Sequence, residues 1–429
     1  MNILIIGSGG REHAIGWKLK QSKQCGKLFF VCGNAGTGQL GVNLPCDITD
    51  FSGIKHICVE EQIELVVVGP EHPLVEGIVD YFRADKVLQD IAIIGPDKQG
   101  ARLEGSKAFA KEFMRKNAIP TAVSMDVTPE TIDVGIEYLR SLAAPYVLKA
   151  DGLASGKGVV ILHNLEEAER ELKSMLEGKF GDASTKVVIE QFLNGLELSV
   201  FVLTDGENYK ILPVAKDYKR IGEGDTGPNT GGMGAVSPVV FADEDFMKKV
   251  ENRIIVPTLK GLKSAGIDYK GFIFLGLMNV ESDPFVIEYN VRLGDPETEC
   301  VVPLIESDLV ELLLAAYRGK LKDTVLEIDD RAAITVMMVS GGYPGNYTTG
   351  KVISGLAGTK ECVVFHAGTS IDVETQKVKS IGGRVLAITA VDYSLEAARK
   401  TVYENVEKVV FQDAAYRTDI GADILAYKA

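Results

Sequence analysis

The feature that most constrains the fold is a regular series of short apolar runs near the start of the chain. Each run is followed directly by Gly or Gly-Pro, and the four runs are residues 3–6, 28–32, 65–68 and 91–94. Stretches with helical periodicity, such as residues 13–20 and 77–84, lie between these runs. This alternation of strand and helix predicts a doubly wound parallel sheet with helices on both faces.

The length of 429 residues is too great for one core, so we expect two to four domains. Residues 331–429 begin with an alternating strand at 333–339 and contain a helix whose apolar residues, including Leu395 and Val402, are spaced for one face. They predict a separate α+β domain. Residues 213–238 are polar and glycine-rich with little periodicity, which predicts a long functional loop.

The composition is that of a globular protein, with 46% hydrophobic and 25% charged residues. The net charge of −14 argues against nucleic acid or an anionic membrane as the main partner. The six cysteines show no zinc-binding spacing, and no stretch has the length and apolar character of a signal peptide or membrane span. We therefore expect a cytoplasmic protein.

The apolar run at residues 285–287 predicts a buried strand, and a row of polar residues follows it. Because side chains alternate along a strand, Glu288 and Asn290 share one face and Arg292 continues it. Carboxylate and amide oxygens are ligands for Mg²⁺, and a guanidinium is a planar fork for a carboxylate or phosphate. The row predicts a metal site beside an anion site. The alternative is a strand end whose polar side chains face solvent.

Two glycine-rich turns follow strands of the first domain. The first, residues 7–12 (GSGGRE), has Glu12 where a dinucleotide-binding turn needs a small residue, and no acidic residue closes the second strand. A nicotinamide-dependent function is therefore disfavoured, whereas a helix N-terminus with Arg11 remains suited to a phosphate. A tight turn that simply requires glycine is the alternative. The second turn, residues 69–73, belongs to the same sheet edge.

Lys149 lies within an apolar strand and is followed by a glycine-rich loop at residues 152–158. The spacing is not that of a Walker A loop, but such a loop could fold over phosphates. A surface loop is the alternative, although it does not explain Lys149, because a buried lysine needs an anionic partner. The strand at residues 187–190 runs into a linker and, taken alone, is only a strand end.

Five segments resemble the glycinamide ribonucleotide synthetase (phosphoribosylamine–glycine ligase) family of the ATP-grasp superfamily. In that family's order, they are GSGGREHA (7–14), GPEHPL (69–74), KADGLASGKGV (149–159), GPNTGGMGA (227–235) and RLGDPETE (292–299). The resemblance implies an α/β and α+β multidomain fold that covers nearly the whole chain. Its parts would be a doubly wound N-terminal pre-domain (1–121), an ATP-grasp small lobe with a lid loop (122–193), a large lobe with the metal site (194–330) and a mixed α+β C-terminal domain (331–429).

The resemblance further implies ATP-dependent ligation of glycine to 5-phosphoribosylamine in de novo purine biosynthesis, through glycyl phosphate, with release of ADP and phosphate. The implied catalytic residues are Lys149, Asp217 and Arg292. The implied ATP-binding residues are Lys107, Lys149, Gly156, Lys157, Glu190, Phe192, Leu193 and Glu197. The implied substrate-binding residues are Gly9, Gly10, Arg11, Glu71, Asp217, Lys219, Asn229, Thr230, Gly231, Met233, Arg292, Asp295, Pro296 and Thr298.

Glu288 and Asn290 are the implied metal ligands, and ATP with Mg²⁺, or with Mn²⁺ in its place, is the implied cofactor. Many ATP-grasp enzymes carry another acidic ligand on the neighbouring strand, here residues 271–275, which have none. The number of metal ions therefore stays open. The expected partners are glycine, phosphoribosylamine and ATP, without nucleic acid or membrane, for a monomer or weak homodimer.

Three other functions remain as alternatives. The nearest is another ATP-grasp carboxylate–amine ligase or a carboxylase, which would use a substrate other than glycine. A nicotinamide-dependent oxidoreductase would bind NADH through the first turn, and a non-catalytic ATP sensor would release no glycine-dependent ADP.

Overall fold

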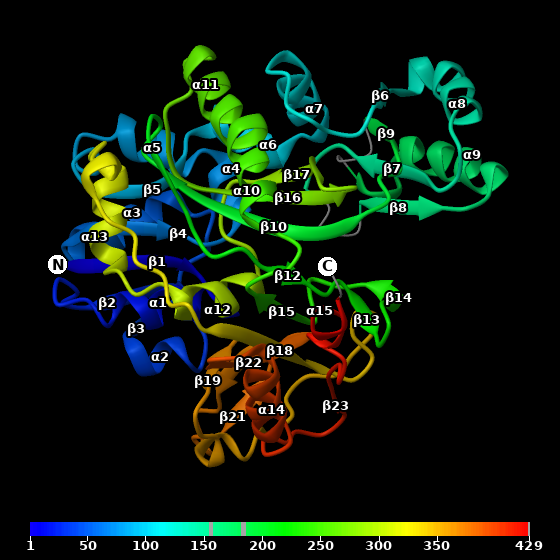
Figure 1. The fold of residues 1–429 in the computed structure, drawn as a ribbon. Coiled ribbons are helices and arrows are strands. Elements are labelled where there is room, and N and C mark those ends of the chain that lie inside the picture. The colour runs from blue at the N-terminus through cyan, green and yellow to red at the C-terminus, as the bar shows by residue number, and fades with distance from the viewer. Residues whose placement is uncertain (154–157, 182–185, 428–429) are drawn as a thin grey trace.

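The computed structural model describes residues 1–153, 158–181 and 186–427 (Figure 1). Its largest sheet has nine strands, and five of them form a parallel array. These strands are β1 (Asn2–Gly7), β2 (Leu28–Cys32), β3 (Val42–Leu44), β4 (Ile63–Val68) and β5 (Ala92–Pro96). The helices between and after them are α1 (Gly10–Leu19), α2 (Thr37–Leu40), α3 (Phe51–Glu60), α4 (Glu71–Glu76), α5 (Ile78–Ala84) and α6 (Lys98–Gly105).

The parallel array is covered on both faces, because successive side chains of a strand point to opposite sides. On β1, Ile3 packs in one apolar cluster with Ile15 of α1, whereas Leu4 packs in another with Ile54 of α3. The predicted doubly wound sheet is therefore confirmed, and all four predicted apolar runs lie in its strands.

The same sheet continues beyond β5 with antiparallel strands, which the sequence did not predict. Tyr269 and Lys270 at the start of β16 pair with Pro96 and Gly95 of β5. The added strands are β10 (Leu196–Thr204), β11 (Tyr209–Ile211), β16 (Tyr269–Val280) and β17 (Asp283–Asn290). Helices of this region are α10 (Glu244–Val250), α11 (Val256–Ser264), α12 (Glu297–Val301) and α13 (Leu309–Tyr317).

A small lobe has its own four-stranded sheet and its own apolar core. Its strands are β6 (Ser124–Val127), β7 (Tyr146–Ala150), β8 (Val159–Leu162) and β9 (Val187–Gln191), with helices α8 (Ile132–Ser141) and α9 (Leu165–Ser174). In Figure 1 this lobe projects at the upper right. Helix α7 (Lys107–Lys116) leads into it, and the Ser106 hydroxyl caps this helix by accepting the Phe109 amide proton at 3.1 Å.

The C-terminal region forms a six-stranded sheet at the bottom of Figure 1. Its strands are β12 (Lys216–Asp217), β15 (Gly234–Ser237), β18 (Ala332–Ser340), β19 (Val363–His366), β22 (Arg384–Asp392) and β23 (Ala414–Ala415). Helix α14 (Leu395–Val406) buries Val402 and Val406 against it, as predicted. Two small hairpins, β13 (Arg220–Gly222) with β14 (Thr226–Asn229) and β20 (Thr369–Ile371) with β21 (Val378–Ser380), and helix α15 (Ala422–Ala426) complete the region.

The prediction of one long loop at residues 213–238 was wrong, because this stretch contains β12 to β15. Two of these strands join the C-terminal sheet: β15 pairs with β18, and β12 pairs with β15. Strands of two to four residues held by backbone hydrogen bonds leave no apolar periodicity in the sequence. No helix within the described residues combines the length and hydropathy that crossing a bilayer requires.

Candidate active site

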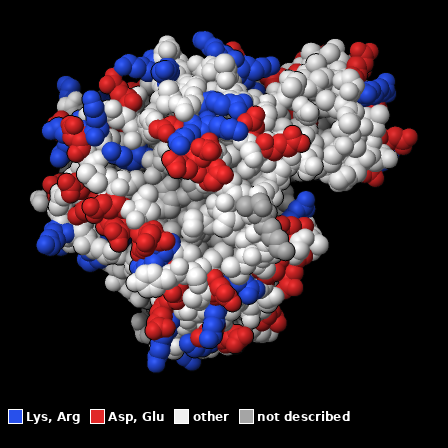
Figure 2. Space-filling view, in the orientation of Figure 1, with Lys and Arg blue, Asp and Glu red and all other residues white. Residues whose placement is uncertain are grey.

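A cavity of 390 Å³ lies where the small lobe, the nine-stranded sheet and the C-terminal sheet meet. In Figure 2 the surface is indented below the small lobe, on the side where these parts face each other. Although the protein is acidic overall, the cavity is lined by cationic and acidic side chains in equal number among the described residues. The cationic residues are Lys107, Lys111, Lys149 and Lys219, here called the lysine end, and Arg11, Arg292 and Arg384, called the arginine end.

Glu288 and Asn290 line the cavity from the end of β17, as the sequence pattern predicts. On the neighbouring strand, Gly276 pairs with Glu288 and Phe274 with Asn290, so that strand offers no acidic ligand at these positions. Burial alone would raise the pKa of Glu288, but Lys219, Lys149, Lys107 and Arg292 hold it below its ordinary value.

An ionised carboxylate beside an amide oxygen is a donor set that fits a hard divalent cation. The described residues contain no cluster of three or more His, Cys, Asp or Glu side chains that could hold a metal ion. Glu288 and Asn290 would therefore share the cation with ligands from substrate or water.

The core of the lysine end is a buried group of three charges. The Glu190 carboxylate forms ion pairs with Lys149 at 3.0 Å and with Lys111 at 3.0 Å. All three side chains are buried, and the Lys149 ammonium also donates to the Ile287 carbonyl at 3.2 Å. Burial lowers the pKa of Lys111 to about 8, although Glu190 opposes the shift. The sequence pattern did not single out Lys111; its only signal was a lysine on the face of α7 that also carries apolar residues.

The two other lysines differ in their partners. Lys107 donates from the start of α7 to the Gly152 carbonyl at 2.9 Å and makes no ion pair with any described residue. Lys219 forms an ion pair with Glu197, and this carboxylate helps to raise the Lys219 pKa well above its ordinary value despite burial. Burial raises the pKa of the adjoining Asp217 to about 8, with Lys219 acting in the opposite direction.

The centre of the arginine end is Arg292. Its guanidinium pairs with Glu104 at 2.8 Å and with Glu71 at 3.3 Å, and donates to the Asn290 side chain at 3.3 Å. Burial raises the pKa of Glu104 to about 7, although Arg292 opposes the shift. Glu104 was missed by sequence reasoning because it lies near the end of α6, outside any glycine-rich turn.

The first glycine-rich turn is filled by Glu12. Its carboxylate accepts the Gly9 amide proton at 2.5 Å and pairs with Arg11 at 2.6 Å. A Cβ on Gly69 of the second turn would lie only 2.1 Å from Glu12 Oε1, so glycine is required there. The space between the two turns is thus occupied by a side chain of the protein, and the Gly9 amide is already satisfied.

Arg384 brings a cation from the C-terminal sheet into the cavity, and sequence reasoning missed it. Its guanidinium pairs with the Asp295 carboxylate at 2.9 Å and donates to the backbone carbonyls of Asp295 and Gly231 at 2.7 and 2.6 Å. Because Arg384 follows Asp295 by 89 positions, no local pattern could join them.

The structure brings most of the predicted residues together around this cavity. Those that line it are Arg11, Glu71, Lys107, Lys149, Glu190, Asp217, Lys219, Thr230, Gly231, Glu288, Asn290, Arg292 and Asp295. Those that do not are Gly9, Gly10, Phe192, Leu193, Glu197, Asn229, Met233, Pro296 and Thr298. Gly156 and Lys157 lie outside the described residues.

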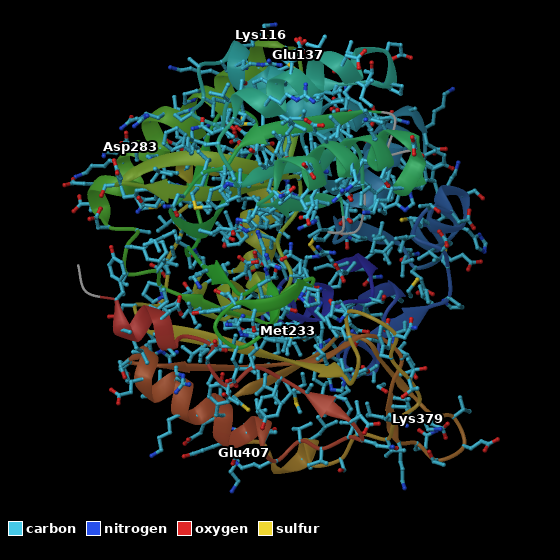
Figure 3. The ribbon with its side chains drawn as sticks, turned by 90° about the vertical axis from the view of Figure 1, so that its right-hand side faces the viewer. Lys116, Glu137, Met233, Asp283, Lys379 and Glu407 are labelled. Carbon is cyan, nitrogen blue, oxygen red and sulfur yellow. The ribbon has the colours of Figure 1, made fainter. Side chains whose placement is uncertain are left out.

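Several residues outside the lining contact it directly. Glu197 pairs with Lys219, and a Cβ on Gly9 would lie 3.2 Å from the Asp295 carboxylate. Met233 differs, because its side chain packs in a buried apolar cluster with Phe365 and Met337. Figure 3 labels Met233 at the level where the green strands meet the C-terminal sheet.

Comparison with protein families accounts for almost the whole chain. Residues 1–104 match the N domain of phosphoribosylglycinamide synthetase, residues 105–298 its ATP-grasp (A) domain and residues 333–423 its C domain. The chain is 45% identical over 427 residues to the phosphoribosylamine–glycine ligase of Escherichia coli O157:H7, covering 98% of each protein. It is 44% identical over 432 residues to the Yersinia pestis ligase, covering 99% of each.

The chain belongs to the phosphoribosylglycinamide synthetase family. The resemblance found in the sequence motifs is thereby confirmed, and so is the three-part architecture with an ATP-grasp core. The crystal structure of the phosphoribosylamine–glycine ligase of Thermotoga maritima superimposes with a TM-score of 0.85 at 39% identity, covering 98% of this chain and 100% of that one.

More distant solved structures share the fold of this phosphoribosylglycinamide synthetase family member. The biotin carboxylase domain of Hydrogenobacter thermophilus 2-oxoglutarate carboxylase has a TM-score of 0.70 at 15% identity, covering 100% of this chain and 99% of that one. A likeness at this identity concerns the fold alone, so it does not favour the carboxylase alternative.

Proposed function

We propose that this chain catalyses the ATP-dependent ligation of glycine to 5-phosphoribosylamine. The glycine carboxylate attacks the γ-phosphate of ATP and forms glycyl phosphate and ADP. The amine of phosphoribosylamine then displaces phosphate and gives glycinamide ribonucleotide, a step of purine biosynthesis. The observation that carries this proposal is the placement of the Glu288–Asn290 row in one cavity between the lysine end and Arg292.

The lysine end would bind ATP. Lys107 and Lys149 face the cavity and can hold phosphate oxygens, because Lys107 makes no ion pair among the described residues. Glu190, fixed by two lysines, is an acceptor for an adenine amino group, and the linker with Phe192, Leu193 and Glu197 would complete the adenine and ribose site. Gly156 and Lys157 would also contribute to ATP binding.

The metal would be Mg²⁺, with Mn²⁺ as an alternative ion, held by Glu288 and Asn290. When bound, it would neutralise phosphate charge and polarise the phosphoryl group for transfer. The protein itself contributes alignment and cationic groups, which is the main form of catalysis in phosphoryl transfer.

The arginine end would bind the two other substrates. Arg292 is fixed by Glu71 and Glu104, so its guanidinium presents a rigid fork to the glycine carboxylate. Asp217, with Lys219 beside it, would orient the amine of glycine. Arg11, Thr230, Gly231 and Asp295 would form the phosphoribosylamine side, with Gly9, Gly10, Asn229, Pro296 and Thr298 around it. Met233 would support this wall from the core.

We further propose a cytoplasmic monomer or weak homodimer. The described cysteines are all free, which is usual for a protein of a reducing compartment.

A substrate-omission assay tests the proposed function. ADP release should require glycine and phosphoribosylamine together, and the product should be glycinamide ribonucleotide. Equal turnover with bicarbonate or with another amino acid in place of glycine would overturn the assignment in favour of another ATP-grasp ligase or carboxylase.

A further inference from the structure

Glu299 on α12 is a buried carboxyl group to which the reaction above gives no role. Its side chain is 0% exposed, and neither oxygen accepts a hydrogen bond from any donor within the described residues. A Cβ on Gly10 would lie 2.2 Å from Glu299 Oε1, so the backbone of α1 closes this side of the carboxyl group. Burying an unpartnered carboxylate is strongly unfavourable, so such a group is kept in its protonated form.

The carboxyl group of Asp295 adjoins that of Glu299. Burial raises the pKa of Glu299 well above its ordinary range, and the negative charge of Asp295 raises it further. Burial would also raise the pKa of Asp295, but Arg384, Arg11 and a hydrogen bond from Glu299 hold it below its ordinary range. Two adjoining carboxyl groups of this kind share one proton, which here belongs to Glu299.

The two carboxyl groups differ in their access to the cavity: Asp295 lines it and Glu299 does not. The strands β15 and β18, which also pack against α12, carry no ionisable side chain. The ionisable groups that face the pair or lie beside it are Arg11 and Glu12 on α1, Arg384 on β22, and Glu297 and Cys300 on α12.

The Asp295 carboxylate reaches the cavity. Arg384 pairs with Oδ1 at 2.9 Å, and 12% of the Asp295 side chain is exposed. A Cβ on Gly9 would lie 3.2 Å from Oδ2, so a side chain at this position would crowd that oxygen. A carboxylate that lines the cavity is placed to accept a proton from a bound amine.

We propose that Asp295 accepts the proton released by the attacking amine, and that Glu299 positions Asp295 by donating a hydrogen bond to it. This inference rests on the proposed function. When the amine nitrogen attacks glycyl phosphate, the C–N bond forms, the bond from the carbonyl carbon to the phosphate oxygen breaks, and its electron pair leaves with phosphate. The N–H proton passes to the Asp295 carboxylate, which returns it to the departing phosphate.

A comparison of two nucleophiles tests the role of Asp295. Hydroxylamine captures glycyl phosphate as a hydroxamate without help from a base, because its nitrogen loses its proton to water. Asp295→Asn should keep glycine- and ATP-dependent hydroxamate formation within a few-fold of wild type. It should lower the formation of glycinamide ribonucleotide by about 10²-fold or more. A parallel fall of both activities, or of neither, would overturn the inference. If wild type itself forms no glycinamide ribonucleotide, it is the proposed function that fails.

Two substitutions test the protonated state of Glu299 through the pH profile of kcat/KM. Glu299→Gln replaces a neutral donor by a neutral donor, so the acidic limb should stay at its wild-type position, with a modest fall in kcat. Glu299→Ala removes the donor, so the limb should move to higher pH and kcat should fall further. If Glu299 were ionised in wild type, Glu299→Gln would remove a negative charge and move the limb to lower pH by about one unit, which contradicts the proposal.

An infrared difference spectrum between wild type and Glu299→Gln decides the question even if Glu299→Ala does not fold. A band of a carboxylic acid in wild type is the expected result. A carboxylate band in its place would overturn the proposal.

Discussion

The lysine end and the arginine end of the cavity carry the same kind of charge but hold it differently. Lys107 contacts a backbone carbonyl rather than a carboxylate, Lys111 and Lys149 share the single carboxylate of Glu190, and only Lys219, with Glu197, has an ion pair of its own among the described residues. In the arginine end each guanidinium has an ion pair of its own, the shortest being Arg11 with Glu12 at 2.6 Å, Arg292 with Glu104 at 2.8 Å and Arg384 with Asp295 at 2.9 Å.

This difference matches the charges of the proposed ligands. The four lysines of the lysine end pair with only two carboxylates, those of Glu190 and Glu197, which suits a polyanion that brings its own negative charge. In the arginine end, carboxylates of the protein already neutralise the guanidinium groups and fix their orientation. This arrangement suits a small ligand that must be aligned. Because the two ends meet at Glu288 and Asn290, substitutions at the junction should affect turnover, and substitutions at either end should affect one substrate.

Glu288→Ala should have the largest effect, because it removes the one carboxylate of the proposed metal site. We expect kcat to fall by about 10²-fold or more at saturating substrates, as the loss of an electrostatic contact to a transition state does. Steady-state kinetics over a range of Mg²⁺ concentrations measures this. Glu244→Ala, which removes an exposed carboxylate on α10, is the control. Near-normal turnover at high Mg²⁺ would exclude Glu288 as a ligand.

Lys149→Met should have the next largest effect, and this effect should be confined to the substrate of the lysine end. We expect the KM for ATP to rise by about 10²-fold, because a buried charge-assisted contact to phosphate is lost, while the KM for glycine changes little. Glu190 keeps its ion pair with Lys111, so the fold should persist, as circular dichroism would show. An equal rise for glycine would mean that the ends do not act separately.

Arg292→Lys should produce the opposite selectivity with a smaller effect. A lysine keeps the charge but cannot form a planar fork between Glu71, Glu104 and a ligand carboxylate. The KM for glycine should rise by about 10-fold, and that for ATP should remain near its wild-type value. Initial rates with each substrate varied in turn provide the measurement. If the KM for glycine did not change, glycine would bind elsewhere.

Glu104→Gln should change the pH dependence of stability rather than activity alone. The Glu104 pKa lies at about 7 in the folded protein, above its ordinary value of 4.5. The folded state therefore binds more protons than the unfolded state between these values, so this group makes stability fall as the pH rises through this window. The variant should lack this fall in the free energy of unfolding, which amounts to about 3 kcal/mol at most. Denaturant unfolding at a series of pH values tests it, and a parallel curve for wild type and variant would contradict it.

The sequence predicted those parts of the fold and site that have a local signature. The apolar runs of β1, β2, β4 and β5 and the row from Glu288 to Arg292 depend on neighbours within a few positions. The residue types and spacing of this row are enough to indicate a metal site beside an anion site. Its position at the junction of two charged groups could not be inferred from its own residues.

The parts that were missed depend on pairings between distant segments. The joining of β16 to β5, the strands within residues 213–238 and the reach of Arg384 to Asp295 have no periodicity to reveal them. Lys111 and Glu104 were missed for a related reason: each lies on a helix, where a charged residue is ordinarily a solvent-exposed one. Their burial follows from tertiary packing alone.

The pairing of β5 with β16 has a consequence for how the chain could be divided. Residues 1–104 match a family domain of their own, yet one edge of their sheet is completed by a strand that begins at Tyr269. A fragment excised at residue 104 would expose the open edge of β5 to any other extended chain, and self-association through that edge is the expected fate. The domain of residues 1–104 therefore depends on a strand more than 160 residues further along the chain to cover the edge of its sheet.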